Sequence, residues 1–310
     1  MVRTLQLVTS RRPFFEQQVE VLERNGVSCT VLAVPGGGRG RSLAAYVRFY
    51  TQVLRAARGP EIDLVHANYG LTAPAALAQP IRPVVLSLWG SDLLGRFGTV
   101  SEHCARFADE VVVMSDEMAG ALDGDATVVP HGIDTDRFAP ESRAEAVDAV
   151  GWDADATHVL FPYDTDRAEK NYPRAERVVE RARDSVEGPV ELHAVSGVPH
   201  EDVPTYMNAA DAMVLTSDRE GSPNAVKEAL ACNLPVVATP VGDVPDLLDG
   251  ADCSTVADTD AALADALTDA LAATADPSGR DRAREFGLDR MGESLLGVYE
   301  RALGGEVTAA

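Results

Sequence analysis

Cysteine and long apolar segments are both scarce in this chain of 310 residues. The four cysteines, Cys29, Cys104, Cys232 and Cys253, are far apart and form no CxxC pair, so we expect neither a disulfide framework nor a cysteine-bound zinc. No stretch approaches the ~18 apolar residues of a membrane span, and the first apolar run is too short for a secretion signal. We therefore expect a soluble, cytoplasmic protein with reduced thiols.

Positive charge is scarce as well. The net charge is -22 and the sequence pI is about 4.5, which excludes a nucleic-acid partner because phosphate-binding surfaces need a cationic footprint. Only two of the 27 basic residues are lysine. This acid-rich, lysine-poor composition is typical of a salt-rich, halophile-like cytoplasm, although a GC-rich genome would also replace lysine by arginine.

Short apolar runs alternate with helical patterns along most of the chain. Their apolarity is continuous, which is typical of parallel strands that helices cover on both faces. This predicts an α/β fold with two series of strands. The expected strands are 4–8, 27–34, 63–67, 83–88 and 110–114, then 158–162, 190–195, 211–216, 234–239 and 253–257.

A segment rich in Pro, Asp and Gly, residues 128–142, separates the two series and is the expected crossing between domains. We place the first domain at 1–135, the second at 136–280, and a helical segment at 281–310 that packs back toward the first. Two doubly wound sheets facing across a cleft would bind a ligand at the carboxyl ends of their strands.

The segment Arg219–Asp243, REGSPNAVKEALACNLPVVATPVGD, contains a helix start directly after a predicted strand. Ser222 is placed as the N-cap and Pro223 as the first helical residue. The backbone N–H groups of Asn224 and Ala225 would then point out of the helix tip, where they can hold a phosphate.

Two glutamates flank this helix tip. Glu228 lies about one and a half turns into the helix and could accept hydrogen bonds from vicinal hydroxyls of a ribose. Glu220 precedes the helix and could meet hydroxyls at the other end of the same ligand. Alternatively, Glu220 stabilises the N-terminus of the helix through the helix dipole, and Glu228 is a surface residue.

The chain has two lysines, Lys170 and Lys227, and Lys227 directly precedes Glu228. Lys170 and Arg167 share a loop after a strand and could neutralise a diphosphate and its leaving-group charge. The alternatives are that Lys170 is a solvated surface lysine and that Lys227 is exposed on its helix.

The stretch EGSPNAVKEALACNLPVVATPVGDVPDLL resembles the donor-site signature of the GT4 family of retaining GT-B glycosyltransferases (glycosyl transferases group 1). The resemblance extends to VPTYMNAADAMVLTSDREG, VVPHGIDTDRFAP and DEVVVMS, and it is closest over residues 150–250. It implies a GT-B fold in which two Rossmann-like domains clasp a nucleotide sugar, the first on the acceptor side and the second on the donor side.

The resemblance also implies roles for individual residues. Glu228 would hold the ribose, Glu220 would contact the donor sugar, and the pair Arg167 and Lys170 would bind the diphosphate. The backbone at Ser222, Pro223, Asn224 and Ala225 would lie against phosphate and sugar, and Ser196 and Gly197 near the base.

Three departures from the family pattern concern catalysis. The family's arginine position corresponds to Thr165, whereas Arg167 is only three residues before Lys170. The loop after the first strand reads SRRPFF in place of a double glycine. Trp89 stands where the family often has a histidine, so Asp92 and His66 become candidates for the acceptor-side catalytic group.

These acceptor-side residues also have structural interpretations. Asp92 could be a helix or turn cap, and His66 a hydrogen-bonded histidine at a strand end. Trp89 could be a core aromatic, a cleft wall or a platform for a sugar, and His131 is expected to be a hydrogen-bonding residue of the linker.

The sequence thus predicts a retaining transferase that moves a hexose-type sugar from a nucleotide diphosphate sugar to a hydroxyl of a lipid-linked, glycan or small-molecule acceptor. We expect no cofactor and no catalytic metal, since the DTD at 134–136 falls in the linker; the DTD at 164–166, near the diphosphate loop, leaves metal dependence open. The alternatives are a catalytically silent GT-B-like binding subunit and a nucleotide-sugar epimerase of the same fold.

Charge is distributed unevenly, with a net of +6 over residues 1–60. The helix expected over 42–59 presents Arg41, Arg48 and Arg55 seven residues apart, in a stripe nearly opposite an apolar face that begins at Leu43 and Val47. The stripe is either a solvated helix side or a contact surface for acidic lipid or an anionic acceptor at the inner face of a membrane.

Overall fold

The computed structural model describes residues 1–36, 42–59, 61–95, 97–273 and 277–305. The chain forms two compact units. One consists of Met1–Gly132 together with Leu288–Ala310, and the other of Ile133–Gly287.

The first unit is built on a parallel sheet with strand order β2-β1-β3-β4-β5-β6. Five of its strands confirm the sequence prediction. The apolar residues of β1, β3, β4 and β5 are buried, whereas those of the edge strand β2 are only half-buried. The sixth, β6, is a two-residue strand at the point where the segment expected to be linker, residues 128–142, begins. The strands are β1 (Arg3–Val8), β2 (Ser28–Ala33), β3 (Leu64–Asn68), β4 (Val84–Ser87), β5 (Glu110–Val113) and β6 (Thr127–Val128).

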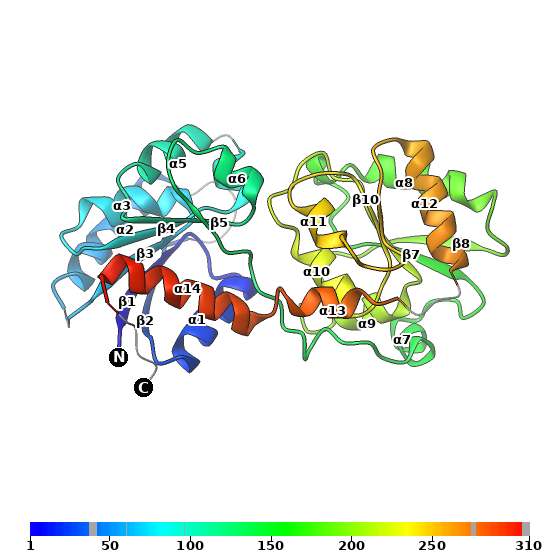
Figure 1. Ribbon diagram of the computed structural model, residues 1–310, viewed down its shortest axis with the longest axis horizontal. Helices are drawn as coiled ribbons and strands as arrows, with labels where there is room; N and C mark the ends of the chain where they lie inside the picture. The colour runs from blue at the N-terminus through cyan, green and yellow to red at the C-terminus, as the bar shows by residue number, and fades with distance from the viewer. Residues whose placement is uncertain (37–41, 60, 96, 274–276, 306–310) are drawn as a thin grey trace. The chain divides into compact units, whose positions relative to one another are not determined.

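Helices cover this sheet, and the last helix of the chain is one of them. α14 (Leu288–Leu303) lies beside α1 (Pro13–Arg24) in Figure 1 and contributes Met291, Leu295, Val298 and Tyr299 to the core. The remaining helices of the unit are α2 (Leu43–Ala56), η1 (Gly70–Thr72), α3 (Ala73–Ala78), α4 (Gly90–Leu93), α5 (Gly98–Ala105) and α6 (Asp116–Gly120).

The second unit has a parallel sheet of order β11-β10-β9-β7-β8, so that β8 is an edge strand. All five strands confirm the prediction. They are β7 (Thr157–Phe161), β8 (Val190–Ala194), β9 (Ala212–Leu215), β10 (Val236–Ala238) and β11 (Thr255–Val256).

Alternate residues of these strands pack on opposite faces of the second sheet. Leu160 and Met213 face the core that contains α10 (Asn224–Ala231), whereas Val159 and Val214 face α8 (Tyr172–Arg183) and α12 (Asp260–Ala272). Figure 1 shows α8 and α12 running on the same side of the sheet. The other helices are α7 (Arg143–Val150), η2 (Ala168–Lys170), α9 (Val203–Ala209), α11 (Val244–Leu248) and α13 (Gly279–Arg284).

Two expectations about helices are wrong in detail. α10 begins at Asn224 with Pro223 as its N-cap, so Ser222 lies before the cap and does not occupy it. In α2 the core side is formed by Phe49 and Val53, and it is not the face that begins at Leu43.

All four cysteines lie in the described part of the chain and are free thiols. Among the described residues, no helix is both long and apolar enough to span a bilayer.

Candidate active site

A buried ion pair joins the loops that follow β7 and β9 in the second unit. Lys170, at the end of η2, donates from Nζ to Oε1 of Glu220, and the same oxygen accepts from Ser217 Oγ at 2.6 Å. The Lys170 side chain is 5% exposed and lies over the ring of Tyr163, 3.8 Å from its centroid. The structure therefore brings together the ammonium expected at the diphosphate and the carboxylate expected at the sugar.

The electrostatics of this pair are those of a charge taken out of water. Burial lowers the pKa of Lys170, and the adjacent Glu220 opposes that shift. The solvated alternative for Lys170 is therefore wrong.

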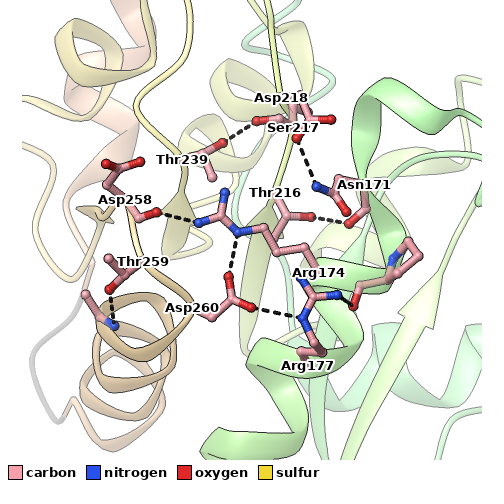
Figure 2. Close-up of polar contacts among 12 residues, drawn as sticks. Asn171, Arg174, Arg177, Thr216, Ser217, Asp218, Thr239, Asp258, Thr259 and Asp260 are labelled. Carbon is pink, nitrogen blue, oxygen red and sulfur yellow. Dashed lines mark hydrogen bonds and ion pairs between the residues drawn. The ribbon is translucent and has the colours of Figure 1, made fainter.

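A network of polar contacts fixes the backbone around this pair (Figure 2). Asn171, which adopts the left-handed region at φ 54°, donates from its side chain to Asp218 at 2.9 Å. Thr216 donates to the Asn171 carbonyl at 3.1 Å, and Thr239 donates to the Ser217 carbonyl at 2.7 Å. The lysine loop and the glutamate loop are consequently tied to each other and to the strand beside them.

The helix that follows Lys170 is anchored independently. Arg174 and Arg177 of α8 each bond one oxygen of Asp260 at the start of α12, at 2.8 and 3.0 Å (Figure 2). Arg174 also donates to the Asp258 carbonyl at 2.5 Å. Because Asp260 is shared by two guanidinium groups, it holds the start of α8, and with it the lysine loop, against α12.

Arg167 shares the loop of Lys170. Its guanidinium donates to Glu169 Oε1 from Nε at 2.9 Å and from Nη2 at 2.8 Å. The Arg167 side chain is 42% exposed, and its carbon Cζ lies 5.7 Å from the centroid of Tyr163. Arg167 and Lys170 thus both lie against Tyr163, which places two positive charges within one loop.

The helix tip of α10 is backed by a close approach of backbone. Gly242 has φ +56°, and a Cβ at this position would come within 2.5 Å of the Gly221 carbonyl oxygen. The next residue, Asp243, donates its N–H to that carbonyl at 3.3 Å. Glycine is therefore required at 242 if the segment between Glu220 and Asn224 is to keep its position.

Glu228 projects from the second turn of α10 and is only 8% exposed. Its Oε1 lies 2.9 Å from Nε2 of His200, whose ring lies 5.4 Å from that of Phe138. The surface alternative for Glu228 is therefore wrong. Sequence reasoning missed His200, and its position in the loop after β8, beside Ser196 and Gly197, was the signal that could have identified it.

Lys227 is fully buried, which corrects the expectation of an exposed helix position. Burial lowers its pKa to about 8, against the opposing charges of Asp243 and Glu228. Burial raises the pKa of Asp243 to about 6, with Lys227 opposing. Both lysines of the chain are thus buried in the second unit.

Ser196 and Gly197 lie in the exposed loop after the carboxyl end of β8, and Gly197 has φ +74°. Their backbone is therefore accessible at the same edge of the sheet as the loops of Lys170 and Glu220. This is compatible with the contact to a base that the resemblance implies.

In the first unit, Asp92 acts as a cap inside the protein. Its side chain is buried, Oδ1 accepts from the N–H of Trp89 at 2.6 Å, and Oδ2 accepts from the N–H of Gly70 at 2.5 Å. Burial raises its pKa to about 7, and the backbone donors oppose that shift. A Cβ on Gly70 would overlap Ser101 Oγ at 2.0 Å, so glycine is required there. Asp92 therefore has the geometry of a helix or turn cap, which is the structural interpretation given for it above.

His66 likewise has the geometry of a hydrogen-bonded histidine near a strand end, its structural interpretation. It is fully buried, with Nδ1 2.8 Å from the hydroxyl of Tyr299 and Nε2 2.7 Å from Ser87 Oγ. Burial lowers its pKa to about 3. Both ring nitrogens are engaged by the protein, so His66 has no nitrogen left for a substrate.

Trp89 lies in a cluster of aromatic rings that come from the start of α1 and from the segments after β3, β4 and β6. Its ring centroid is 4.8 Å from Phe14, 5.6 Å from Tyr69 and 5.4 Å from His131. Trp89 is 9% exposed and His131 8%. Two of the departures from the family pattern therefore meet in one place, where Phe14 of the SRRPFF segment packs edge-on against Trp89.

Comparison with known proteins identifies both units. Residues 4–137 match the family described as Glycosyltransferase Family 4, and residues 169–273 match Glycosyl transferases group 1. A putative teichuronic acid biosynthesis glycosyltransferase, TuaC of Bacillus subtilis, is 32% identical over 215 residues, covering 60% of this chain and 55% of TuaC. The D-inositol 3-phosphate glycosyltransferase of Mycobacterium tuberculosis is 29% identical over 237 residues, covering 64% and 49%. The chain spans about half the length of these curated relatives.

Solved structures share the fold at low sequence identity. A sucrose-phosphate synthase from Thermosynechococcus elongatus superposes with a TM-score of 0.80 at 16% identity, covering 98% of this chain and 100% of the other. The Anabaena protein HepE, solved in complex with UDP and glucose, gives 0.74 at 16% identity, covering 97% and 100%. With its two doubly wound parallel-sheet units and its family matches in both, the chain belongs to the group 1 (family 4) glycosyltransferases of GT-B fold.

Proposed function

We propose that the protein transfers a sugar from a nucleotide diphosphate sugar to an acceptor hydroxyl with retention of anomeric configuration. The observation that carries this proposal is the buried pair of Lys170 and Glu220, held by Ser217 at the carboxyl edge of the second sheet. The names of the relatives support sugar transfer, and the UDP and glucose in the Anabaena structure support a nucleotide sugar as donor.

In this proposal the diphosphate lies against the tip of α10. The N–H groups of Asn224 and Ala225 and the backbone of Ser222 and Pro223 would face the phosphates, with the dipole of the helix favouring the negative charge. Arg167 and Lys170 would neutralise the charge that develops on the leaving diphosphate, which is where electrostatic stabilisation contributes most to rate. Arg167 would exchange Glu169 for a phosphate that offers a higher charge.

The two glutamates divide the ligand between them. Glu220 would accept hydrogen bonds from hydroxyls of the sugar while Lys170 fixes its position. Glu228 would accept from the ribose hydroxyls, and the contact with His200 orients its carboxylate. The base would lie over Ser196 and Gly197. Asp92 and His66 are given structural roles, because the atoms they could offer a substrate are already bonded within the protein.

We also propose that transfer needs no metal and no other cofactor. Asp164, in the DTD sequence nearest the diphosphate loop, accepts the N–H of Asp166 at 2.9 Å and stabilises a turn. The positive charge required at the diphosphate is supplied by Arg167, Lys170 and the helix tip. Transfer should therefore continue in excess chelator; a loss that Mg²⁺ or Mn²⁺ restores would contradict this part of the proposal.

The experiment that tests the function is incubation of the pure protein with UDP-, GDP- and ADP-sugars. We expect one donor to raise the melting temperature and to release its nucleoside diphosphate. Glu228→Gln should weaken donor binding about 10- to 100-fold, because charge-assisted hydrogen bonds contribute about 1.5–3 kcal/mol. Glu220→Gln should lower kcat by about 10²–10³ with little change in donor affinity.

The matched control is Glu180→Gln on the exposed side of α8, where Glu180 pairs with Arg183. It should leave donor affinity and kcat unchanged. Donor binding with no release by the wild type would identify a binding subunit, and conversion of the donor without release of diphosphate would identify an epimerase. Equal losses of affinity and turnover in both glutamate variants would contradict the division of roles.

For the acceptor side, we propose that α2 meets an anionic surface, either membrane lipid or a lipid-linked acceptor. Leu43 and Val47 are 82% and 57% exposed on this helix. They line a shallow surface hollow together with Arg48 and Arg55. The sequence pattern placed the arginines nearly opposite Leu43 and Val47, whereas all four side chains lie around the same surface hollow. Exposed apolar side chains next to guanidinium groups are the pattern of a helix that lies in a membrane interface. Arg41, the third arginine of the expected stripe, lies outside the described residues.

A further inference from the structure

Two histidines and a glutamate meet on one face of the strand pair β7 and β8 in the second unit. In the parallel register His158 is opposite Glu191, and Leu160 is opposite His193. Opposed residues of paired strands share a face, and so do residues two apart on one strand. The three side chains therefore project to the same side, at the edge of the sheet that β8 forms.

The spacing of their donor atoms is that of a metal-binding triangle. His158 Nδ1 is 3.0 Å from His193 Nε2, and Glu191 Oε2 is 3.4 Å from His193 Nε2 and 3.8 Å from His158 Nδ1. An ion bound tetrahedrally through bonds of about 2.0–2.1 Å requires its ligand atoms to be roughly 3.3–3.4 Å apart. The three separations bracket that value, so small side-chain rotations are enough to bring all three atoms onto one ion.

Hydrogen bonds already fix the tautomer of the buried ligand. His158 Nε2 donates to the backbone carbonyl of Asp153 at 2.9 Å, which leaves the lone pair of Nδ1 facing His193. A ring N–H given to a backbone carbonyl is the usual support behind a metal-binding histidine. The indole of Trp152 stacks on His193 with centroids 3.7 Å apart and planes at 11°, so that ring is held in place as well.

We propose that His158, Glu191 and His193 bind one Zn²⁺ ion, with water as the fourth ligand. Two imidazole nitrogens and one carboxylate favour zinc over Mg²⁺ or Ca²⁺, which prefer oxygen ligands. His158 is fully buried, His193 is 20% exposed at its side chain and Glu191 46%, so the open position faces solvent. The ion would join the edge strand β8 to β7 and to the turn at Asp153. This site is separate from the proposed donor site, whose residues follow the carboxyl ends of the strands.

The test uses the full chain, stripped of metal by chelator and titrated with Zn²⁺ by calorimetry in excess Mg²⁺. The Mg²⁺ occupies weak carboxylate sites on this acidic protein. We expect one zinc per chain and a rise in melting temperature, since an ion that binds the folded state stabilises it. His193→Gln and Glu191→Gln alter the more exposed ligands and leave buried His158 intact, so both variants should fold. Each should weaken zinc binding at least tenfold.

The matched control is His103→Gln, which changes an exposed histidine of α5 in the first unit. It should bind zinc as the wild type does. Co²⁺ bound to the wild type should show the visible absorption of a four-coordinate site, and His193→Gln should abolish it. The proposal is overturned if zinc binding is absent in the wild type, is displaced by Mg²⁺, or is equal in the wild type and both ligand variants. Sugar transfer is not part of the readout, so failure here leaves the proposed function untouched.

Discussion

At the scale of single residues, Lys227 and Asp243 are two buried groups of opposite charge whose charges act on each other. Lys227 is fully buried and Asp243 is 8% exposed. Burial shifts both pKa values toward the neutral forms, and each residue limits the shift of the other. Such a pair makes stability depend on pH, because folding changes the proton affinity of each group.

We predict the direction of that dependence for Lys227. Its pKa is about 8 in the folded protein, against an ordinary value of 10.5. Between these values the folded state binds fewer protons than the unfolded chain, so the free energy of unfolding rises with pH. Relative to Lys227→Met, the wild type should gain about 2–4 kcal/mol from pH 8 to pH 10.5. Urea unfolding of both proteins across this range measures the difference, and a constant difference would contradict the shift.

Residues of the candidate site could be selected from the sequence where the segment carried a motif. Glu220, Glu228 and Lys170 could be selected because helix-tip chemistry and the rarity of lysine both pointed to them. His200 was missed because its contact with Glu228 depends on how the loop after β8 meets α10, which no local pattern encodes. His66 was nominated by its place at a strand end, but only the fold reveals that Tyr299 reaches it from the last helix.

At the level of elements, α2 illustrates why the buried face of a helix is harder to predict than the presence of the helix. The sequence placed Leu43 and Val47 on the core face, whereas the core side carries Phe49 and Val53. Apolar residues surround enough of this helix to define more than one stripe. Only the packing against the sheet determines which stripe is buried.

The exposed face of α2 leads to a membrane prediction. Arg48→Glu combined with Arg55→Glu should reduce sedimentation with anionic vesicles, because each arginine near such a surface contributes about 1 kcal/mol. The same change at Arg181 and Arg290, two exposed arginines elsewhere, is the charge-matched control. The loss should be largest at low salt, since the Debye length falls to ~3 Å at 1 M. Unchanged sedimentation would remove α2 from the acceptor-side proposal.

A second prediction at this level concerns α14. The hydroxyl of Tyr299 lies 2.8 Å from His66 Nδ1 and accepts from Gln6 Nε2 at 3.0 Å. Tyr299→Phe therefore removes the partner of His66 Nδ1 and of one N–H of the Gln6 amide, whose Nε2 keeps its bond to Thr4. We expect a loss of about 1–3 kcal/mol in the free energy of unfolding. Tyr50→Phe is the control, because its hydroxyl bonds the Ala78 carbonyl at 3.2 Å near the surface. If both changes lowered the free energy of unfolding equally, the buried hydrogen bonds of Tyr299 would contribute no more to stability than the surface bond of Tyr50.

The strands themselves were predictable as elements because continuous apolar runs have few alternatives in a chain of this kind. Ten of the observed strands had been placed from the sequence. β6 (Thr127–Val128) was not, since two residues in a Pro-rich stretch carry no period, and its pairing with β5 depends on the sheet already being formed.

At the level of the whole molecule, the net charge of -22 governs the response to salt. Like charges repel in the compact state, and salt reduces that repulsion by shortening the Debye length from ~10 Å at 0.1 M to ~3 Å at 1 M. We predict a higher melting temperature in 2 M KCl than in 50 mM KCl. A melting temperature that is flat or falls with KCl would exclude adaptation to a salt-rich cytoplasm and favour genome composition as the origin of the arginine bias.

The return of the chain to the first unit has a consequence for biosynthesis. Ile133 and Gly287 bound the second unit and are paired to each other in a β-bridge, so the ends of this unit meet. A ribosome completes residues 133–287 before it makes α14, which supplies Met291, Leu295 and Val298 to the first core. The first unit, although begun earlier, therefore cannot complete its core until the ribosome has made the whole second unit and then α14.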